Sequence, residues 1–105
     1  MERMIAPIDF NDLLKEATAS VLVMKSEPTV LEIVSSLISK FITKIRLRKL
    51  DQNENLSITE LNNKYEKLLS YIYNLYPSEE FPEIWDFIRR ESLKHSEILM
   101  AITES

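Results

Sequence analysis

The absence of glycine constrains this chain more than any other feature of its sequence. At average usage a chain of 105 residues contains about seven glycines, and this one contains none. Glycine supplies the backbone freedom on which phosphate-binding loops, nucleophile elbows and tight hairpin turns depend. The sequence therefore disfavours most nucleotide-binding and hydrolase folds. It favours helices joined by short turns that Asn, Ser or Pro can make.

The composition favours a single soluble all-α domain. Hydrophobic residues make up 45% of the sequence, enough for a core in a chain of this length. There is no cysteine, so disulfides, thiolate ligands and a thiol nucleophile are excluded. No apolar run approaches the ~20 residues of a membrane span, and Met1 to Pro7 lack the pattern of a signal peptide. We therefore expect a cytoplasmic protein without membrane association.

Apolar residues recur at helical spacing in four segments, which predicts an antiparallel four-helix bundle. The helices are expected at about residues 10–24, 28–49, 58–76 and 81–103. Asp9 is the expected N-cap of the first helix, and prolines fit the first turns of the second and fourth. The polar run at residues 51–55 predicts a loop.

The third helix opens with the clearest local signal in the sequence. Ser57 and Glu60 have the spacing of a capping box, and Leu56 with Leu61 fits the accompanying hydrophobic staple. The apolar residues that follow at three- and four-residue steps predict a bundle seam. They are Ile58, Leu61, Tyr65, Leu68, Ile72 and Leu75.

The second helix has an apolar face that is too wide for one stripe. Such width predicts contact on more than one side, either as a central helix or through a partner. The residues concerned are Val30, Leu31, Ile33, Val34, Leu37, Ile38, Phe41, Ile42 and Ile45.

The same helix has an unusual charge pattern, with five basic residues and no acidic residue between Ile33 and Leu50. Lys40, Lys44 and Arg48 recur every four residues and form a ridge, which Arg46 and Lys49 widen. Such a ridge is either a solvated face whose cations complement the helix dipole or a docking surface for an acidic partner or a phosphate backbone. We predict that it binds a partner.

Four tyrosines crowd the third helix, at positions 65, 71, 73 and 76. Tyr65 and Tyr76 are expected in the core. Tyr71 and Tyr73 are expected on the surface, where tyrosine favours protein interfaces, with base stacking as an alternative. We predict that Tyr71 and Tyr73 contact a partner.

His95 is the only histidine, and it falls on the expected buried stripe of the last helix. Glu91 and Ser92 precede it by one turn, so an imidazole and a carboxylate could share a metal. The segment IRRESLKHSEIL resembles the last helix of ferritin-like proteins, in which a Glu-x-x-His step supplies iron ligands. Here Ser92 holds the glutamate position, and Glu91 lies about 100° away around the helix. We therefore expect an ordinary hydrogen-bonded histidine, no metal and no cofactor.

Residues 8–75 resemble the helical domain of archaeal GINS subunits, which are scaffold proteins of the replication fork. Three stretches carry the resemblance: Ile8-Asp9-Phe10, FITKIRLRKL at residues 41–50, and NLSITELNNKY at residues 55–65. GINS subunits generally add a small β-rich domain, whereas the end of this chain predicts another helix. The resemblance implies a homo- or hetero-oligomeric assembly that bridges the MCM helicase, a RecJ-like partner and primase without chemistry of its own.

No carboxylate pair, Ser-His-Asp set or metal-ligand cluster stands out, so we predict a non-catalytic interaction or scaffold protein rather than an enzyme. The resemblance implies DNA-replication proteins as its partners. Two alternatives stay open: a degenerate ferritin-like bundle with weak or no metal binding, and a small DNA-binding protein that uses the basic ridge. The net charge of −4 disfavours the second and leaves only weak or indirect nucleic-acid contact.

Overall fold

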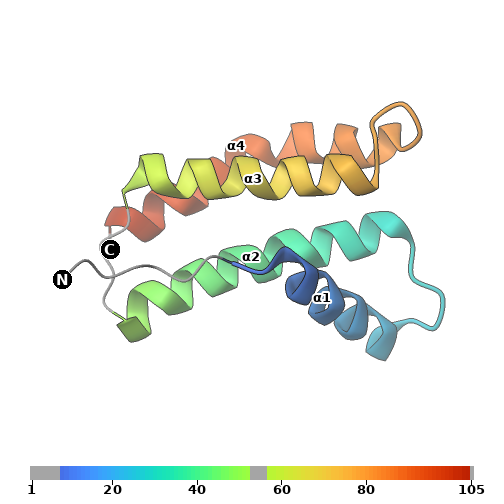
Figure 1. Ribbon diagram of the computed structural model, residues 1–105, viewed down its shortest axis with the longest axis horizontal. Helices are drawn as coiled ribbons and strands as arrows, with labels where there is room; N and C mark the ends of the chain where they lie inside the picture. Colours follow the sequence, from blue (N-terminus) through green and yellow to red (C-terminus); the bar gives the residue numbers. More distant parts are fainter. Residues whose placement is uncertain (1–7, 53–56, 105) are drawn as a thin grey trace.

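Four helices build the protein: α1 (Phe10–Met24), α2 (Val30–Gln52), α3 (Ile58–Leu75) and α4 (Pro82–Glu104) (Figure 1). The computed structural model describes residues 8–52 and 57–104, and no strand occurs in these ranges. Consecutive helices run in opposite directions, with α3 and α4 side by side and α1 inclined to α2 (Figure 1). The predicted all-α, antiparallel four-helix bundle is thereby confirmed. Within the same ranges, no helix is long and apolar enough to cross a bilayer.

The start of α2 differs from the prediction because Thr29, not Pro28, determines where the helix begins. The hydroxyl of Thr29 accepts a hydrogen bond from the amide of Glu32 at 3.1 Å. The Glu32 carboxylate accepts in return from the amide of Thr29 at 2.9 Å and from its hydroxyl at 2.9 Å. This is a second capping box, which the sequence analysis missed. The hydrogen bonds from the amide and the hydroxyl of Thr29 to the carboxylate, with one from Lys25, lower the pKa of Glu32 to about 2.

The end of α2 also differs from the prediction. The helix continues to Gln52, so the predicted loop at residues 51–55 is wrong for Asp51 and Gln52. No glycine or proline follows Leu50 to stop the helix there. The rest of that loop lies outside the described residues.

The predicted N-caps of α1 and α3 are confirmed. The Asp9 carboxylate accepts from the amides of Asn11 and Asp12 at 3.0 and 3.2 Å. The Ser57 hydroxyl accepts from the amide of Glu60 at 3.1 Å. Leu56, the predicted half of the staple, lies outside the described residues. These caps satisfy amides that a helix start otherwise leaves unpaired.

Most of the wide apolar face of α2 is buried within the chain, and only Val30, Leu31 and Ile33 are half-buried. α2 packs against α1 on one side and α4 on another. At its middle, the fully buried Phe41 ring contacts Phe10 of α1 and Tyr65 of α3, with centroid distances of 6.5 and 6.3 Å. Of the two explanations that the sequence left open, the central helix is the one observed.

The predicted seam of α3 is largely confirmed. Leu61, Tyr65, Leu68 and Ile72 are buried. The two ends of the seam differ, because Ile58 at the first position of the helix is half-buried and Leu75 at the last has 43% of its surface exposed. Tyr76 is half-buried against Phe81, at a ring distance of 5.2 Å.

The capping box of α2 is tested by Thr29→Ala. We expect this variant to lower the free energy of unfolding by about 1 kcal/mol, because the Glu32 amide loses its acceptor. The matched control is Thr59→Ala, at an exposed threonine in the first turn of α3, which should change stability by less than about 0.5 kcal/mol. Urea denaturation at neutral pH measures both. Equal losses in the two variants would show that Thr29 does not cap α2.

Candidate interaction surface

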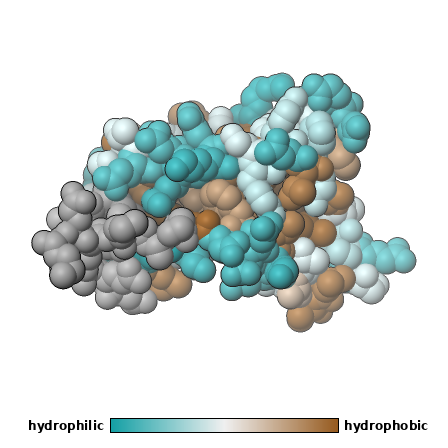
Figure 2. Space-filling model, in the orientation of Figure 1, coloured by the Kyte–Doolittle hydropathy of each residue, from teal (hydrophilic) through white to brown (hydrophobic). Residues whose placement is uncertain are grey.

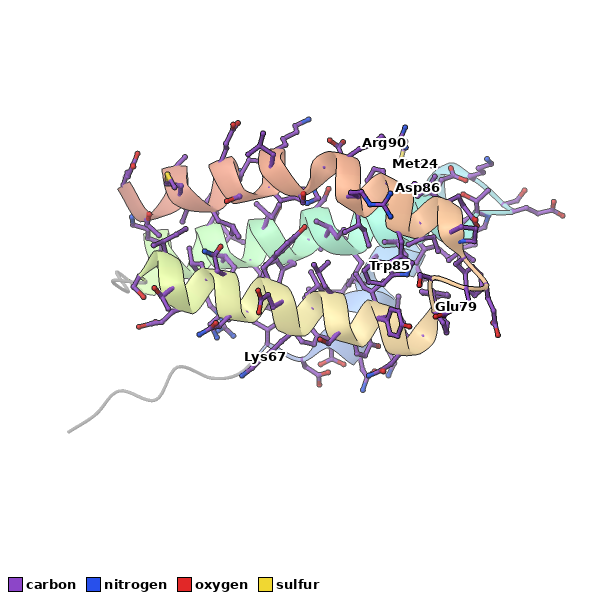
Figure 3. All side chains as sticks on the ribbon, turned by 90° about the horizontal axis from the view of Figure 1, so that it is seen from above. Met24, Lys67, Glu79, Trp85, Asp86 and Arg90 are labelled. Carbon is purple, nitrogen blue, oxygen red and sulfur yellow. The ribbon has the colours of Figure 1, made fainter. Side chains whose placement is uncertain are left out.

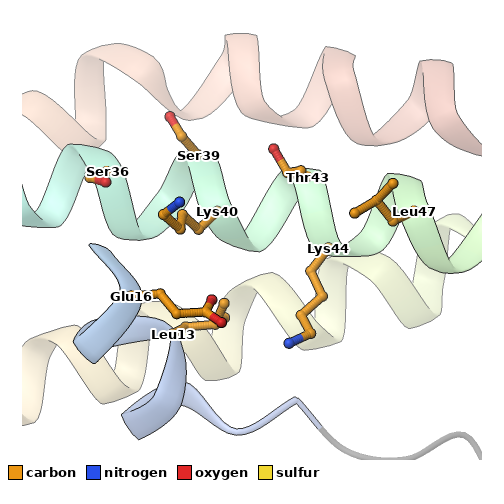
Figure 4. Close-up of a pocket in the computed structure, with 8 residues that line it drawn as sticks. All are labelled: Leu13, Glu16, Ser36, Ser39, Lys40, Thr43, Lys44 and Leu47. Atoms are coloured by element: carbon orange, nitrogen blue, oxygen red, sulfur yellow. The ribbon is translucent and has the colours of Figure 1, made fainter. Parts of the chain in front are cut away.

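A groove runs between the start of α1 and the outer side of α2 (Figure 4). Its volume is about 390 Å³. It is lined by Leu13 and Glu16 of α1 and by Ser36, Ser39, Lys40, Thr43, Lys44 and Leu47 of α2. The groove exists because α1 begins beside Phe41 and runs back toward the start of α2. α1 therefore leaves this side of the second half of α2 uncovered, and half of the Leu47 surface (50%) is exposed.

Lys40 and Lys44 are the charged residues that α2 contributes to the groove. Both are half-buried, so their aliphatic stems pack along the helix while their ammonium groups reach solvent. Neither forms an ion pair or a side-chain hydrogen bond with another described residue. Glu16 points toward the same groove from α1 (Figure 4). The two ammonium groups are therefore available to a ligand, beside the negative charge of Glu16.

The rest of the predicted ridge does not belong to this groove. The ammonium group of Lys49 donates to the carbonyl oxygen of Ile102, near the end of α4. A cation there complements the negative end of the α4 dipole, so Lys49 acts within the bundle. Arg46 is exposed and Arg48 is half-buried, and neither lines the groove. The structure thus divides the five predicted residues, with Lys40 and Lys44 alone on the hollow surface.

Tyr71 is not the surface residue that the sequence predicted. Its ring is half-buried against Phe10, at a centroid distance of 5.5 Å, and its hydroxyl donates to the Asn11 side-chain oxygen at 2.7 Å. Burial raises the pKa of Tyr71, and Tyr76 and Asp9 raise it further. Tyr71 therefore links α3 to α1 and is half-buried rather than exposed, whereas its contact with a partner stays a prediction.

Tyr73 does lie on the surface, with 42% of it exposed. Its hydroxyl donates to the Glu79 carboxylate at 3.2 Å, and its ring lies 5.5 Å from that of Trp85. Tyr73 follows Tyr71 by two residues, about 200° around the helix, so it faces Trp85 of α4 rather than α1 and belongs to a surface separate from the groove. The two predicted tyrosines therefore have different roles.

The lone histidine is held inside the core. Only 7% of His95 is exposed, and its Nδ1 lies 2.7 Å from the Tyr65 hydroxyl. Burial raises the pKa of Tyr65 to about 12, so this hydroxyl stays protonated. It donates to Nδ1 or accepts from it according to which ring nitrogen carries the proton. Burial also lowers the pKa of His95, an effect that Glu91 opposes and Lys94 strengthens. His95 is thus hydrogen-bonded as expected. Among the described residues, no group of three acidic or histidine side chains could hold a metal ion.

A second hollow, of about 490 Å³, lies where the end of α1 meets α2 and α4. Its apolar lining includes Met24, Leu31 and Phe87, and Figure 2 shows a hydrophobic area at the lower right, where α1 ends. At its edge the Lys25 ammonium group pairs with the Glu32 carboxylate at 3.1 Å. Because these charges neutralise each other, this hollow selects for neither an acidic nor a basic ligand.

Two features of the groove were not predicted. The hydroxyls of Ser36, Ser39 and Thr43 recur at three- and four-residue steps, so a helical projection of α2 could have placed them beside the lysines. Glu16 could not have been found in this way, because its position depends on how α1 crosses α2.

Comparisons of the chain with protein-family profiles, with curated proteins and with solved structures found no match. The GINS-like and ferritin-like resemblances therefore stay predictions.

The buried histidine predicts a specific pH dependence of stability. Because the pKa of His95 is lowered in the fold, the unfolded chain binds more protons than the native one once the pH falls through the ordinary value of 6.5. We expect the free energy of unfolding to decrease between about pH 7.5 and about pH 5.5, a window above the titration of carboxylates. His95→Gln, whose amide still offers Tyr65 a hydrogen-bond partner, should flatten that decrease. The same slope in both proteins would assign it to other groups.

Proposed function

We propose that this chain is a non-catalytic interaction protein that binds an acidic segment of a partner in the groove between α1 and α2. The observation that carries the proposal is the pair of Lys40 and Lys44. The two residues lie one helical turn apart along a hollow surface, and their ammonium groups have no ion-pair partner among the described residues. Solvent and salt screen an ion pair less in a groove than on a flat, fully exposed surface. Carboxylates of a ligand therefore interact more strongly with these lysines than with lysines on a flat surface.

The other groove residues favour a helix as the bound segment. Ser36, Ser39 and Thr43 are small, which lets a second helix approach α2 closely. The exposed part of Leu47 offers an apolar contact at one end. An amphipathic helix presents apolar and charged residues at this spacing, and binding in a groove is a common way for such helices to be recognised.

Glu16 adds selectivity to this proposal. Its carboxylate faces the groove from α1 and repels an acidic residue placed against it. A ligand with acids only on its α2 side is therefore favoured over one that is acidic all round. Duplex DNA suits the groove less well for the same reason, because its phosphates meet Glu16 and Leu47 as well as the lysines.

The replication-assembly hypothesis remains one specific form of this proposal. Lys44 lies within the FITKIRLRKL stretch that carries the resemblance to GINS subunits. The width of the α2 apolar face gives little support to packing against another subunit, because α1, α3 and α4 bury most of that face. The partner that this hypothesis names would therefore have to contact the outer side of α2.

The proposal is tested with labelled amphipathic peptides of about 15 residues, long enough to form a marginal helix. Three peptides share their apolar positions and carry Glu, Gln or Lys beside them. We expect binding of the Glu peptide alone, and Lys40→Gln with Lys44→Gln should weaken it about five- to thirtyfold, the loss of two partly exposed ion pairs. Fluorescence anisotropy measures the affinities.

The matched control is Lys67→Gln with Lys94→Gln, which makes the same change in net charge at exposed lysines of α3 and α4. It should leave the affinity within about twofold of the original, since exposed charges away from the groove are screened. Equal losses in the two double variants, or equal binding of all three peptides, would contradict the proposal. Tighter binding of duplex DNA than of the Glu peptide would favour the DNA-binding alternative instead.

A further inference from the structure

Tyr73 of α3 and Trp85 of α4 form an aromatic corner near the turn that joins the two helices (Figure 3 labels Trp85 and Glu79). Their ring centroids lie 5.5 Å apart and their planes meet at 67°. Leu69, Ser70 and Asn74 complete a hollow of about 330 Å³ around the two rings. Because the two rings are steeply inclined to each other, a group bound in this hollow can contact the edge of one ring and the face of the other.

Both rings are fixed by hydrogen bonds within the chain. The Trp85 indole N–H donates to the Tyr76 carbonyl oxygen at 2.7 Å. The Tyr73 hydroxyl donates to the two Glu79 oxygens at 3.2 and 3.5 Å. The polar atoms of both side chains are therefore already used, and a ligand meets the rings in positions that need little further ordering.

The charge around this corner favours a cation. Glu79 is exposed and touches the Tyr73 hydroxyl, and Glu80 and Glu83 follow on the exposed surface of the turn and of α4. Arg89, one turn beyond Trp85, pairs with Asp86 at 3.3 Å. The faces of aromatic rings are electron-rich, so they attract a cation and repel an anion.

We propose that Tyr73, Trp85 and Glu79 bind an arginine side chain of a partner protein. A guanidinium group is planar and weakly hydrated, so it stacks on an aromatic face while its N–H groups donate to a nearby carboxylate. A lysine ammonium is more strongly hydrated and lacks this planar contact. The site is independent of the groove on α2, which attracts the opposite charge.

Trp85 is the only tryptophan in the chain, so its fluorescence reports on this corner alone. The probe is N-acetyl-arginine amide, and the control ligand is the corresponding citrulline amide, which has nearly the same shape but no charge. We expect saturable changes in Trp85 emission with arginine, with a dissociation constant on the order of millimolar, and none with citrulline.

Two variants with the same net charge locate the interaction. Glu79→Gln should weaken arginine binding about two- to fivefold, whereas Glu80→Gln should change it less than Glu79→Gln does. Tyr73→Leu, which keeps apolar bulk but removes the ring face, should abolish saturation. Circular dichroism confirms that each variant is folded.

Three results would each overturn the proposal. Equal responses to arginine and citrulline would show that charge is not recognised. Equal effects of Glu79→Gln and Glu80→Gln would remove Glu79 from the site. Retention of binding in Tyr73→Leu would show that the aromatic corner is not the binding element.

Discussion

Phe41 projects from the middle of α2 into the core, where its ring contacts Phe10 of α1 and Tyr65 of α3. Phe10 also contacts Tyr71, and Tyr65 contacts His95 of α4 at a ring distance of 5.6 Å. A continuous series of ring contacts thus joins all four helices through α2. Since large buried side chains contribute several kcal/mol each, this series determines which side of α2 faces the core and which side is left to solvent.

The groove follows from the same arrangement. The contact of Phe10 with Phe41 places the start of α1 at the middle of α2, so α1 covers only the first half of the longer helix on that side. Lys40 and Lys44 lie where this cover ends. Both lysines belong to α2, which packs against α1 and α4. A binding site on a well-packed helix is preorganised for its ligand.

Periodicity in the sequence predicted the parts of the fold that depend on one helix at a time. The apolar steps of α3 placed Tyr65 and Leu68 in the core, and the capping residues placed the starts of α1 and α3. The capping box of Thr29 and Glu32 has the same spacing as that of Ser57 and Glu60, so the sequence contained the signal. The start of α2 was nevertheless predicted at Pro28, because proline fits the first turn of a helix.

The features that the sequence could not predict depend on two helices together. The width of the apolar face of α2 predicted that this face is covered. It did not show whether other helices of the chain or a partner cover it. Tyr71 was predicted to be exposed because its position on α3 alone does not reveal that Phe10 and Asn11 lie against it. Lys49 reaches the end of α4, a contact between residues 53 positions apart in the chain. The candidate site likewise combines α2 with Glu16 and Leu13 of α1.

The most direct test of this account is to locate the bound acidic peptide on the protein by mapping changes in backbone amide chemical shifts by NMR. The account predicts that the largest changes fall on the groove residues of both helices, including Leu13, Lys44 and Leu47. Residues around the aromatic corner, such as Tyr73 and Trp85, should change little. Largest changes at that corner, or changes spread evenly over the bundle, would contradict the claim that the outer side of α2 is the binding surface.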